Sequence, residues 1–145
     1  MVRRYGPVTA LGLLAGAVLG LGLTQMPTGQ VSAARASDDV GCTDPYVVDG
    51  DTLRCGGTRI RLAGIDAPEL PGHCARGRAC TPGDPFASSD HLRALVGGAT
   101  MECRRTDIDR YGRTVARCSV RGTDLSCAQI AGGFAIRRYA SISCP

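Results

Sequence analysis

The chain has 145 residues and contains 17 arginines, no lysine, 13 acidic residues and eight cysteines. This length predicts one domain and excludes a large multidomain enzyme. A hydrophobic content of 43% with scattered charges is typical of a globular protein and argues against a disordered tail or a collagen-like repeat.

The first 36 residues have the pattern of a secretory signal peptide. Two arginines precede an apolar run from Val8 to Leu23, and a small-x-small cleavage site ends at Ala36. We expect cleavage after Ala36, which leaves a mature domain at 37–145, secreted or periplasmic and without stable membrane association. The alternative is an uncleaved signal anchor, because the apolar run is near the lower limit for a membrane span.

The charge of the chain lies largely in this leader. The segment 37–145 keeps 14 arginines and all 13 acids, which gives a formal net charge of +1. This near balance excludes a strongly cationic coat, so binding of a polyanion must depend on locally placed arginines.

All eight cysteines follow the expected cleavage point. Their even number, in a chain directed to an oxidising compartment, predicts four disulfides. With two Phe and no Trp the core is modest, and each bridge is expected to add ~2 to 4 kcal/mol. A zinc site at His73, Cys74 and Cys80 is the rival interpretation, but the gap between the cysteines is too long for structural zinc spacing.

Short alternating runs predict three strands at the start of the mature domain. Asp49-Gly50 is a strong hairpin-turn signal between the first two strands. In the third strand, Arg59 and Arg61 fall on one face and the aliphatic side chains on the other. The expected strands are residues 46–48, 52–54 and 58–63.

A loop, a helix and a second group of elements follow. Residues 66–82 are rich in Pro and Gly, which predicts an ordered loop closed by a local Cys74–Cys80 bridge. Asp84-Pro85 predicts the start of a helix that ends at Gly97-Gly98. Two further strands are expected at 99–104 and 114–120, followed by a short helix capped by Thr123-Asp124.

The order of these elements is β-β-β-α-β-β-α. It predicts a mainly β (α+β) fold, a five-stranded Greek-key barrel of the OB type with two or three short helices.

Three stretches concentrate polar residues beside turns: 49–52, 61–69 and 109–113. Each stretch alone also fits an ordinary turn or a solvated loop. If the three converge at one end of the barrel, they supply two or three carboxylates, two arginines and a tyrosine. Carboxylates suit Ca²⁺ or Mg²⁺, and planar guanidinium groups suit phosphate, so a phosphodiester is the expected substrate.

Taken together, three motifs resemble those of the staphylococcal-nuclease-like (thermonuclease) family. They are D-G-D-T at 49–52, R-L-x-G-I-D-A-P-E at 61–69 and D-R-Y-G-R at 109–113. The resemblance covers about residues 45–140. It implies a calcium-dependent endonuclease with an OB-fold that hydrolyses DNA and RNA with little base preference, here in a secreted, cysteine-rich form.

The resemblance also implies which residues hold the cation. Asp51 and Asp66 would be the carboxylate ligands of Ca²⁺, and the main-chain carbonyl of Ala67 would be a further ligand. Asp49 would support these ligands without binding the ion itself.

Catalytic and substrate-binding roles follow in the same way. Glu69 would be the general base, while Arg61 and Arg113 would hold the scissile phosphate and stabilise its transition state. Arg110 stands where the family commonly has Lys, and only six residues follow Tyr139. The substrate contacts implied by the resemblance are Arg110, Tyr111 and Tyr139.

Two further expectations complete the sequence analysis. The alternative function is a non-catalytic OB-fold module that binds nucleic acid or protein. The nuclease is preferred, acting as a monomer on DNA and RNA without an obligate protein partner, because a binding module has no need of the complete set of acids and arginines. The predicted neighbours favour the disulfides Cys42–Cys55, Cys74–Cys80, Cys103–Cys118 and Cys127–Cys144 among the many possible pairings.

Overall fold

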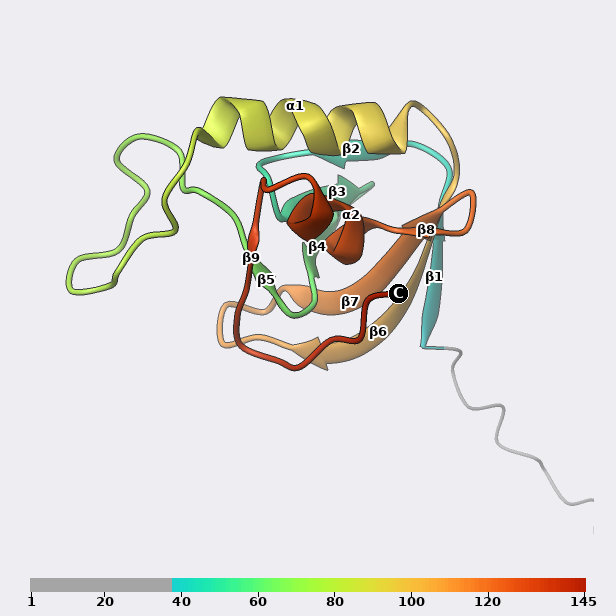
Figure 1. Ribbon diagram of the computed structural model, residues 1–145. Coiled ribbons are helices and arrows are strands. Elements are labelled where there is room, and N and C mark those ends of the chain that lie inside the picture. The colour runs from blue at the N-terminus through green and yellow to red at the C-terminus, as the bar shows by residue number, and fades with distance from the viewer. Residues whose placement is uncertain (1–37) are drawn as a thin grey trace, which may run out of the picture. The chain divides into compact units, whose positions relative to one another are not determined.

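A computed structural model describes residues 38–145 (Figure 1). The predicted signal peptide at 1–36 lies outside the described residues. Between residues 38 and 145, no helix has the length and apolar character needed to cross a membrane.

Seven strands form one curled sheet. They are β1 (Asp39–Cys42), β2 (Pro45–Val47), β3 (Thr52–Cys55), β4 (Thr58–Leu62), β6 (Met101–Ile108), β7 (Thr114–Val120) and β8 (Thr123–Asp124). The order is β1-β6-β7-β4-β3-β2, with β8 paired to β7. All pairs are antiparallel except β4 and β7, which are parallel.

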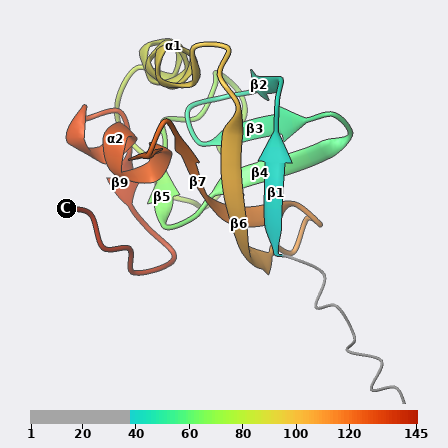
Figure 2. The same ribbon diagram turned by 90° about the vertical axis from the view of Figure 1, so that its right-hand side faces the viewer.

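The sheet curls because its two edge strands are neighbours in the chain. Only Thr43 and Asp44 separate β1 from β2, although these strands stand at opposite ends of the strand order. A disulfide between Cys42 and Cys55 ties β1 to the end of β3. In Figure 2, β1 runs beside β6 and the chain then turns into β2 close to α1 (Pro85–Val96). The result is a half-barrel.

Both helices begin at the predicted aspartates. The side chain of Asp84 accepts hydrogen bonds from two backbone N–H groups in the first turn of α1, and Pro85 occupies the first helical position. The helix ends at Gly97, whose φ of 52° is accessible to glycine at little cost. Asp124 caps α2 (Leu125–Ala131), where its side chain accepts a hydrogen bond from the backbone N–H of Cys127.

An aliphatic core fills the inside of the curled sheet beneath the helices. In β4, the buried Ile60 and Leu62 alternate with the outward-facing Arg59 and Arg61, as the period of a strand requires. The largest fully buried apolar side chains are Leu53, Ile60, Leu62, Ile65, Leu92, Met101 and Leu125.

The mainly β fold with two helices confirms the predicted class, but the prediction of five strands was too low. The structure has nine strands between residues 38 and 145, including a separate two-stranded ladder of β5 (Ile65–Asp66) and β9 (Ile136–Arg137). β1 was missed because Asp-Val-Gly-Cys shows no alternation and is held by pairing with the distant β6. Asp66, expected in a loop, lies in β5 for the same reason.

The four disulfides pair as predicted, and no cysteine of the described chain is free. Cys103 and Cys118 face each other directly in the register of β6 and β7. Cys127–Cys144 ties the C-terminal tail to α2, so the segment that carries Tyr139 is fixed at both ends.

Candidate active site

The three polar stretches meet at one groove of about 830 Å³. Of the residues singled out from the sequence, the buried Asp51, Asp66 and Ala67 do not line this groove. The others do: Asp49, Arg61, Glu69, Arg110, Tyr111, Arg113 and Tyr139. One wall comes from β4, the loop that carries Glu69 and Arg78, and the C-terminal segment that carries Tyr139, and the other comes from the turn between β6 and β7.

Arg61, on β4, lies between the carboxylates of Asp51 and Asp66. Its Nη1 donates to Asp51 Oδ1 and its Nη2 to Asp66 Oδ1, each at 2.9 Å. The antiparallel register of β3 and β4 explains this placement, because it sets Thr52 opposite Arg61 and so brings Asp51 alongside. A single guanidinium therefore bridges two carboxylates.

Asp51 is buried and held from three sides. Its Oδ1 also accepts from the Thr52 hydroxyl at 2.9 Å, and its Oδ2 accepts from the backbone N–H of Ala67 at 3.0 Å. Asp49 Oδ1 accepts from the backbone N–H of Asp51, which fixes the turn. Burial raises the pKa of Asp51 to about 7, although Arg61 acts in the opposite direction.

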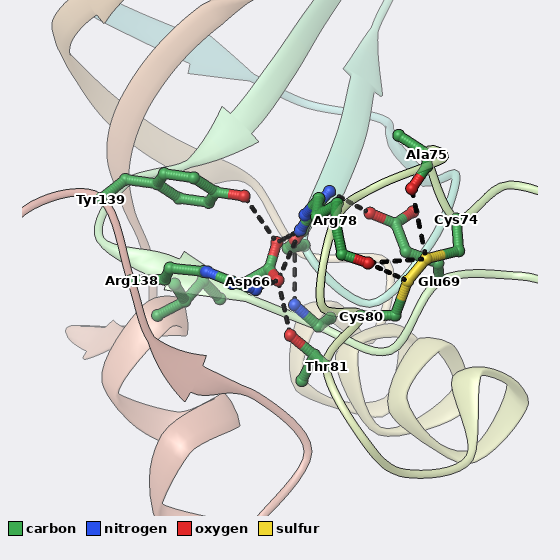
Figure 3. Close-up of polar contacts among 12 residues, drawn as sticks. Asp66, Glu69, Cys74, Ala75, Arg78, Cys80, Thr81, Arg138 and Tyr139 are labelled. Atoms are coloured by element: carbon green, nitrogen blue, oxygen red, sulfur yellow. Dashed lines mark hydrogen bonds and ion pairs between the residues drawn. A yellow bond between two sulfur atoms is a disulfide. The ribbon is translucent and has the colours of Figure 1, made fainter.

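Asp66 is fully buried and is surrounded by side chains that donate hydrogen bonds to it (Figure 3). Besides Arg61, its oxygens accept from Arg78, Arg138 at 2.9 Å, the Thr81 hydroxyl, and the Tyr139 hydroxyl at 3.4 Å. Burial opposes ionisation, but the hydrogen bonds from Thr81, Arg78 and Arg138 outweigh it and lower the pKa of Asp66 to about 2. Asp66 therefore stays charged.

Arg78 is a site residue that the sequence did not reveal. Its Nη1 donates to Glu69 Oε1 at 2.8 Å while its Nη2 donates to Asp66, so it links the two acids (Figure 3). It lies in the loop closed by Cys74 and Cys80. The only sequence signal for Arg78 is an arginine enclosed by a short disulfide loop that begins five residues after Glu69.

The opposite wall is a turn organised by one acid. Asp109 Oδ1 accepts from the backbone N–H groups of Tyr111 and Arg113, and its Oδ2 accepts from Arg113 Nε at 2.7 Å. Burial opposes ionisation of Asp109, but the hydrogen bonds from Arg113 and Tyr111 lower its pKa. Gly112, with a φ of 75°, allows the tight turn. This wall thus holds Arg113 through a single ion pair.

Two exposed tyrosine rings stand on the two walls. Tyr111 carries the guanidinium of Arg110 at 4.8 Å from its ring centre and that of Arg113 at 5.4 Å. Tyr139 lies within 5.4 to 5.9 Å of the guanidinium groups of Arg61, Arg78 and Arg138. The two tyrosine residues are 66% and 67% exposed, so a large part of each side chain is open to solvent. Arg138, like Arg78, was not predicted.

Asp51 and Asp66 carry carboxylate oxygens, the ligand type that calcium prefers, but both carboxylates form ion pairs with Arg61. Arg61 occupies the space between the two carboxylates, and Asp66 also forms ion pairs with Arg78 and Arg138. Across residues 38–145, no group of three His, Cys, Asp or Glu side chains is close enough to form a metal site. Any cation bound by these oxygens would therefore compete with guanidinium groups.

The model of the staphylococcal nuclease homologue family matches residues 59–144. The chain belongs to this family. The match spans β4, the Glu69 region, the turn at Arg113 and Tyr139, and therefore includes both walls of the groove.

Two curated relatives extend this comparison. The succinoglycan biosynthesis protein ExoI of Rhizobium meliloti (strain 1021) is 31% identical over 147 aligned residues, covering 95% of this chain and 77% of the relative. The probable endonuclease LCL3 of Coccidioides posadasii (strain C735) is 41% identical over 64 residues, covering 43% of this chain but 19% of that protein. Family membership and the second relative support a nuclease-like function.

Proposed function

We propose that this protein is a secreted, calcium-dependent nuclease that hydrolyses phosphodiester bonds in DNA and RNA and acts as a monomer. The observation that carries the proposal is the groove itself, because it is lined by Arg61 and Glu69 on one wall and Arg113 on the other. Two guanidinium groups and a carboxylate base around one cavity suit the hydrolysis of an anionic ester.

The cation would be held by Asp51, Asp66 and the main-chain carbonyl of Ala67, with Asp49 fixing the turn that carries Asp51. When bound, calcium neutralises charge that develops on the phosphate oxygens. Asp66, with its lowered pKa, supplies a permanent negative charge to this site.

Arg61 and Arg113 would hold the scissile phosphate from the two walls. Each guanidinium has five N–H donors. Arg113 uses only its Nε with a side-chain partner, and its terminal nitrogens have no protein acceptor within residues 38–145. These free donors can bind two phosphate oxygens and stabilise the additional charge of the transition state.

Glu69 would accept a proton from the attacking water. Its Oε1 is bonded to Arg78, which orients the carboxylate, while its Oε2 accepts no hydrogen bond from any described residue. An oriented carboxylate with one free oxygen at the edge of the groove is suited to general-base catalysis.

Tyr111 and Tyr139 would stack on bases, and Arg110 would bind a flanking phosphate. Every base has a π-face, so stacking on exposed tyrosines gives affinity with little sequence preference. The four disulfides, together with the predicted leader, support an oxidising, extracytoplasmic location.

The decisive assay incubates the protein with single-stranded DNA and with RNA in calcium, magnesium or chelator. We expect hydrolysis in calcium, loss of hydrolysis in chelator, and at least ~100-fold lower kcat for Glu69→Gln. Glu102→Gln is the matched control, since the exposed Glu102 on β6 is the only other glutamate in the chain.

Other outcomes of this assay separate the alternatives. Binding of the single-stranded DNA or RNA in calcium, without cleavage, would identify a non-catalytic binding module. Cleavage that persists in chelator would contradict the calcium assignment, and equal activity of the Glu69→Gln and Glu102→Gln variants would contradict the role of Glu69.

A further inference from the structure

We infer that β3 and β4 carry a second phosphate-binding subsite, formed by Arg54 and Arg59, which extends the groove along a single-stranded nucleic acid. The inference rests on the proposed function and adds the path of the substrate beyond the cleaved linkage. It concerns residues that contribute nothing to the catalytic groups described above.

The first observation is a like-charge pair in the sheet. Arg54 and Arg59 are directly opposite each other in the antiparallel register of β3 and β4, and both are exposed. Directly opposed like charges on one face of a sheet are destabilising. Neither arginine forms an ion pair with any residue from 38 to 145. An anion lying across the two strands would remove this repulsion.

The second observation is a hollow of about 640 Å³ that adjoins the main groove. It lies between the tip of the β3–β4 hairpin, including Arg59, and the turn that carries Tyr111 and Arg113. Tyr111 and Arg113 also line the main groove, so the two hollows share these residues. A strand held at Arg113 can therefore continue past the Tyr111 ring towards Arg59.

The spacing along β4 suits such a path. Arg59 and Arg61 are two residues apart on the same face of the strand, a rise of about 7 Å. Two long side chains at this separation can reach neighbouring phosphates of an extended strand. Arg61 serves the scissile phosphate in the proposed function, so Arg59 is placed for the next phosphate and Arg54 supports it from β3.

The hairpin that carries the subsite is held in place. Cys55, at the end of β3, is bonded to Cys42 of β1, and Gly56 with a φ of 55° forms the tight turn. Figure 2 shows the β3–β4 hairpin extending to one side of the sheet, away from α2 and the C-terminus. Charges fixed on a rigid hairpin bind a strand with a smaller loss of entropy than charges on a mobile loop.

The experiment measures cleavage of short and long substrates by the full chain carrying Arg59→Ala or Arg54→Ala/Arg59→Ala. The probes are a thymidine dinucleotide, a 12-residue oligothymidylate and a 12-residue oligouridylate. We expect the KM of both long probes to rise about fivefold with kcat unchanged, and the KM of the dinucleotide to stay constant. Arg104→Ala removes one exposed arginine from β6 and is the matched control.

Salt dependence gives a second readout. The dissociation constant of the oligothymidylate is measured over a range of salt concentrations, with Glu69→Gln present to prevent cleavage. Each lost phosphate contact is expected to reduce the slope of log Kd against log salt by ~0.7. The double variant should show one such step, the Arg59 variant part of it, and the Arg104 variant none.

The results distinguish failure of the subsite from failure of the proposed function. If the wild-type chain does not cleave any probe, the proposed function fails. If it cleaves but the Arg59 and Arg104 variants behave alike, or if the dinucleotide is affected as strongly as the long probes, the subsite is refuted. Equal effects on oligothymidylate and oligouridylate are expected because the contact is to phosphate, and an effect on one alone would contradict this.

Discussion

The two walls of the groove hold their arginines in different ways. On the wall that contains β4, Arg61 is 12% exposed and bridges two buried carboxylates, and Asp66 in turn binds several further donors. On the opposite wall, Arg113 is 20% exposed and depends on Asp109 alone. The first wall belongs to the buried part of the site, whereas the second is the turn that joins β6 to β7.

This difference separates stability from activity. A buried ion pair that loses one partner leaves the other charge uncompensated, which is strongly destabilising. A partly exposed pair such as Arg113–Asp109 contributes less to stability. The same loss of a phosphate-binding guanidinium should therefore have different structural consequences on the two walls.

Arg61→Ala is expected to produce the largest effect. It should lower kcat/KM by ~100-fold or more and reduce the free energy of unfolding by ~3 to 5 kcal/mol, because the buried Asp51 loses its only cationic partner among the described residues. Enzyme kinetics and urea denaturation measure the two effects.

Arg113→Ala is the comparison variant. It should lower kcat/KM by a similar factor while changing the free energy of unfolding by less than ~1 kcal/mol. Equal destabilisation by the two variants would show that the walls do not differ as described.

Arg78→Ala is expected to tighten calcium binding by about tenfold, which corresponds to ~1.4 kcal/mol. The guanidinium competes with a cation for Asp66 and Glu69, and its removal leaves more negative charge at the site. Isothermal titration calorimetry measures the affinity without reference to activity.

Arg76→Ala provides the control for this experiment, because Arg76 is an exposed arginine of the same disulfide loop. Its affinity for calcium should remain close to that of the wild type. Weaker binding by the Arg78 variant would mean that Arg78 organises the acids for the ion instead of competing with it.

Asp109→Asn tests the opposite wall with a smaller expected change. Arg113 loses a charged acceptor, and the turn loses part of its organisation, so kcat/KM should fall by about fivefold. Asp107→Asn, two residues earlier on β6, is the control. No difference between these variants would show that Asp109 does not position Arg113.

The smallest effect expected is on the pH dependence of stability. The pKa of Asp109 lies below its ordinary value of 3.8, so its stabilising contribution is complete above that value and is lost as the pH falls through the lowered pKa. The difference in unfolding free energy between wild type and Asp109→Asn, ~1 kcal/mol or less at pH 7, should shrink below pH 3.8. A difference that grows in acid would contradict the ion pair.

Local signals were sufficient to predict much of the fold. The Asp84-Pro85 start and the Gly97 end of α1 were predicted correctly because capping depends on a few adjacent residues. The strands missed or shortened in the prediction are held by distant partners. β6 continues to Ile108 because it pairs with β7, and β5 exists because β9 returns to it from the end of the chain.

The candidate site shows the same limit. Its motifs were visible in the sequence because each is a compact run of polar residues, and the structure brings them to one groove. Arg78 and Arg138 were missed because they reach Asp66 across 12 and 72 residues, through a disulfide loop and the C-terminal segment. No local pattern specifies such contacts.

The most direct test of the central claim is a crystal structure of the Glu69→Gln variant with calcium and a phosphorothioate trinucleotide. The claim is that both walls act on one phosphate, so Arg61 and Arg113 should each lie within hydrogen-bond distance of the same phosphate group. A strand bound outside the groove, or a phosphate touched by neither arginine, would contradict it.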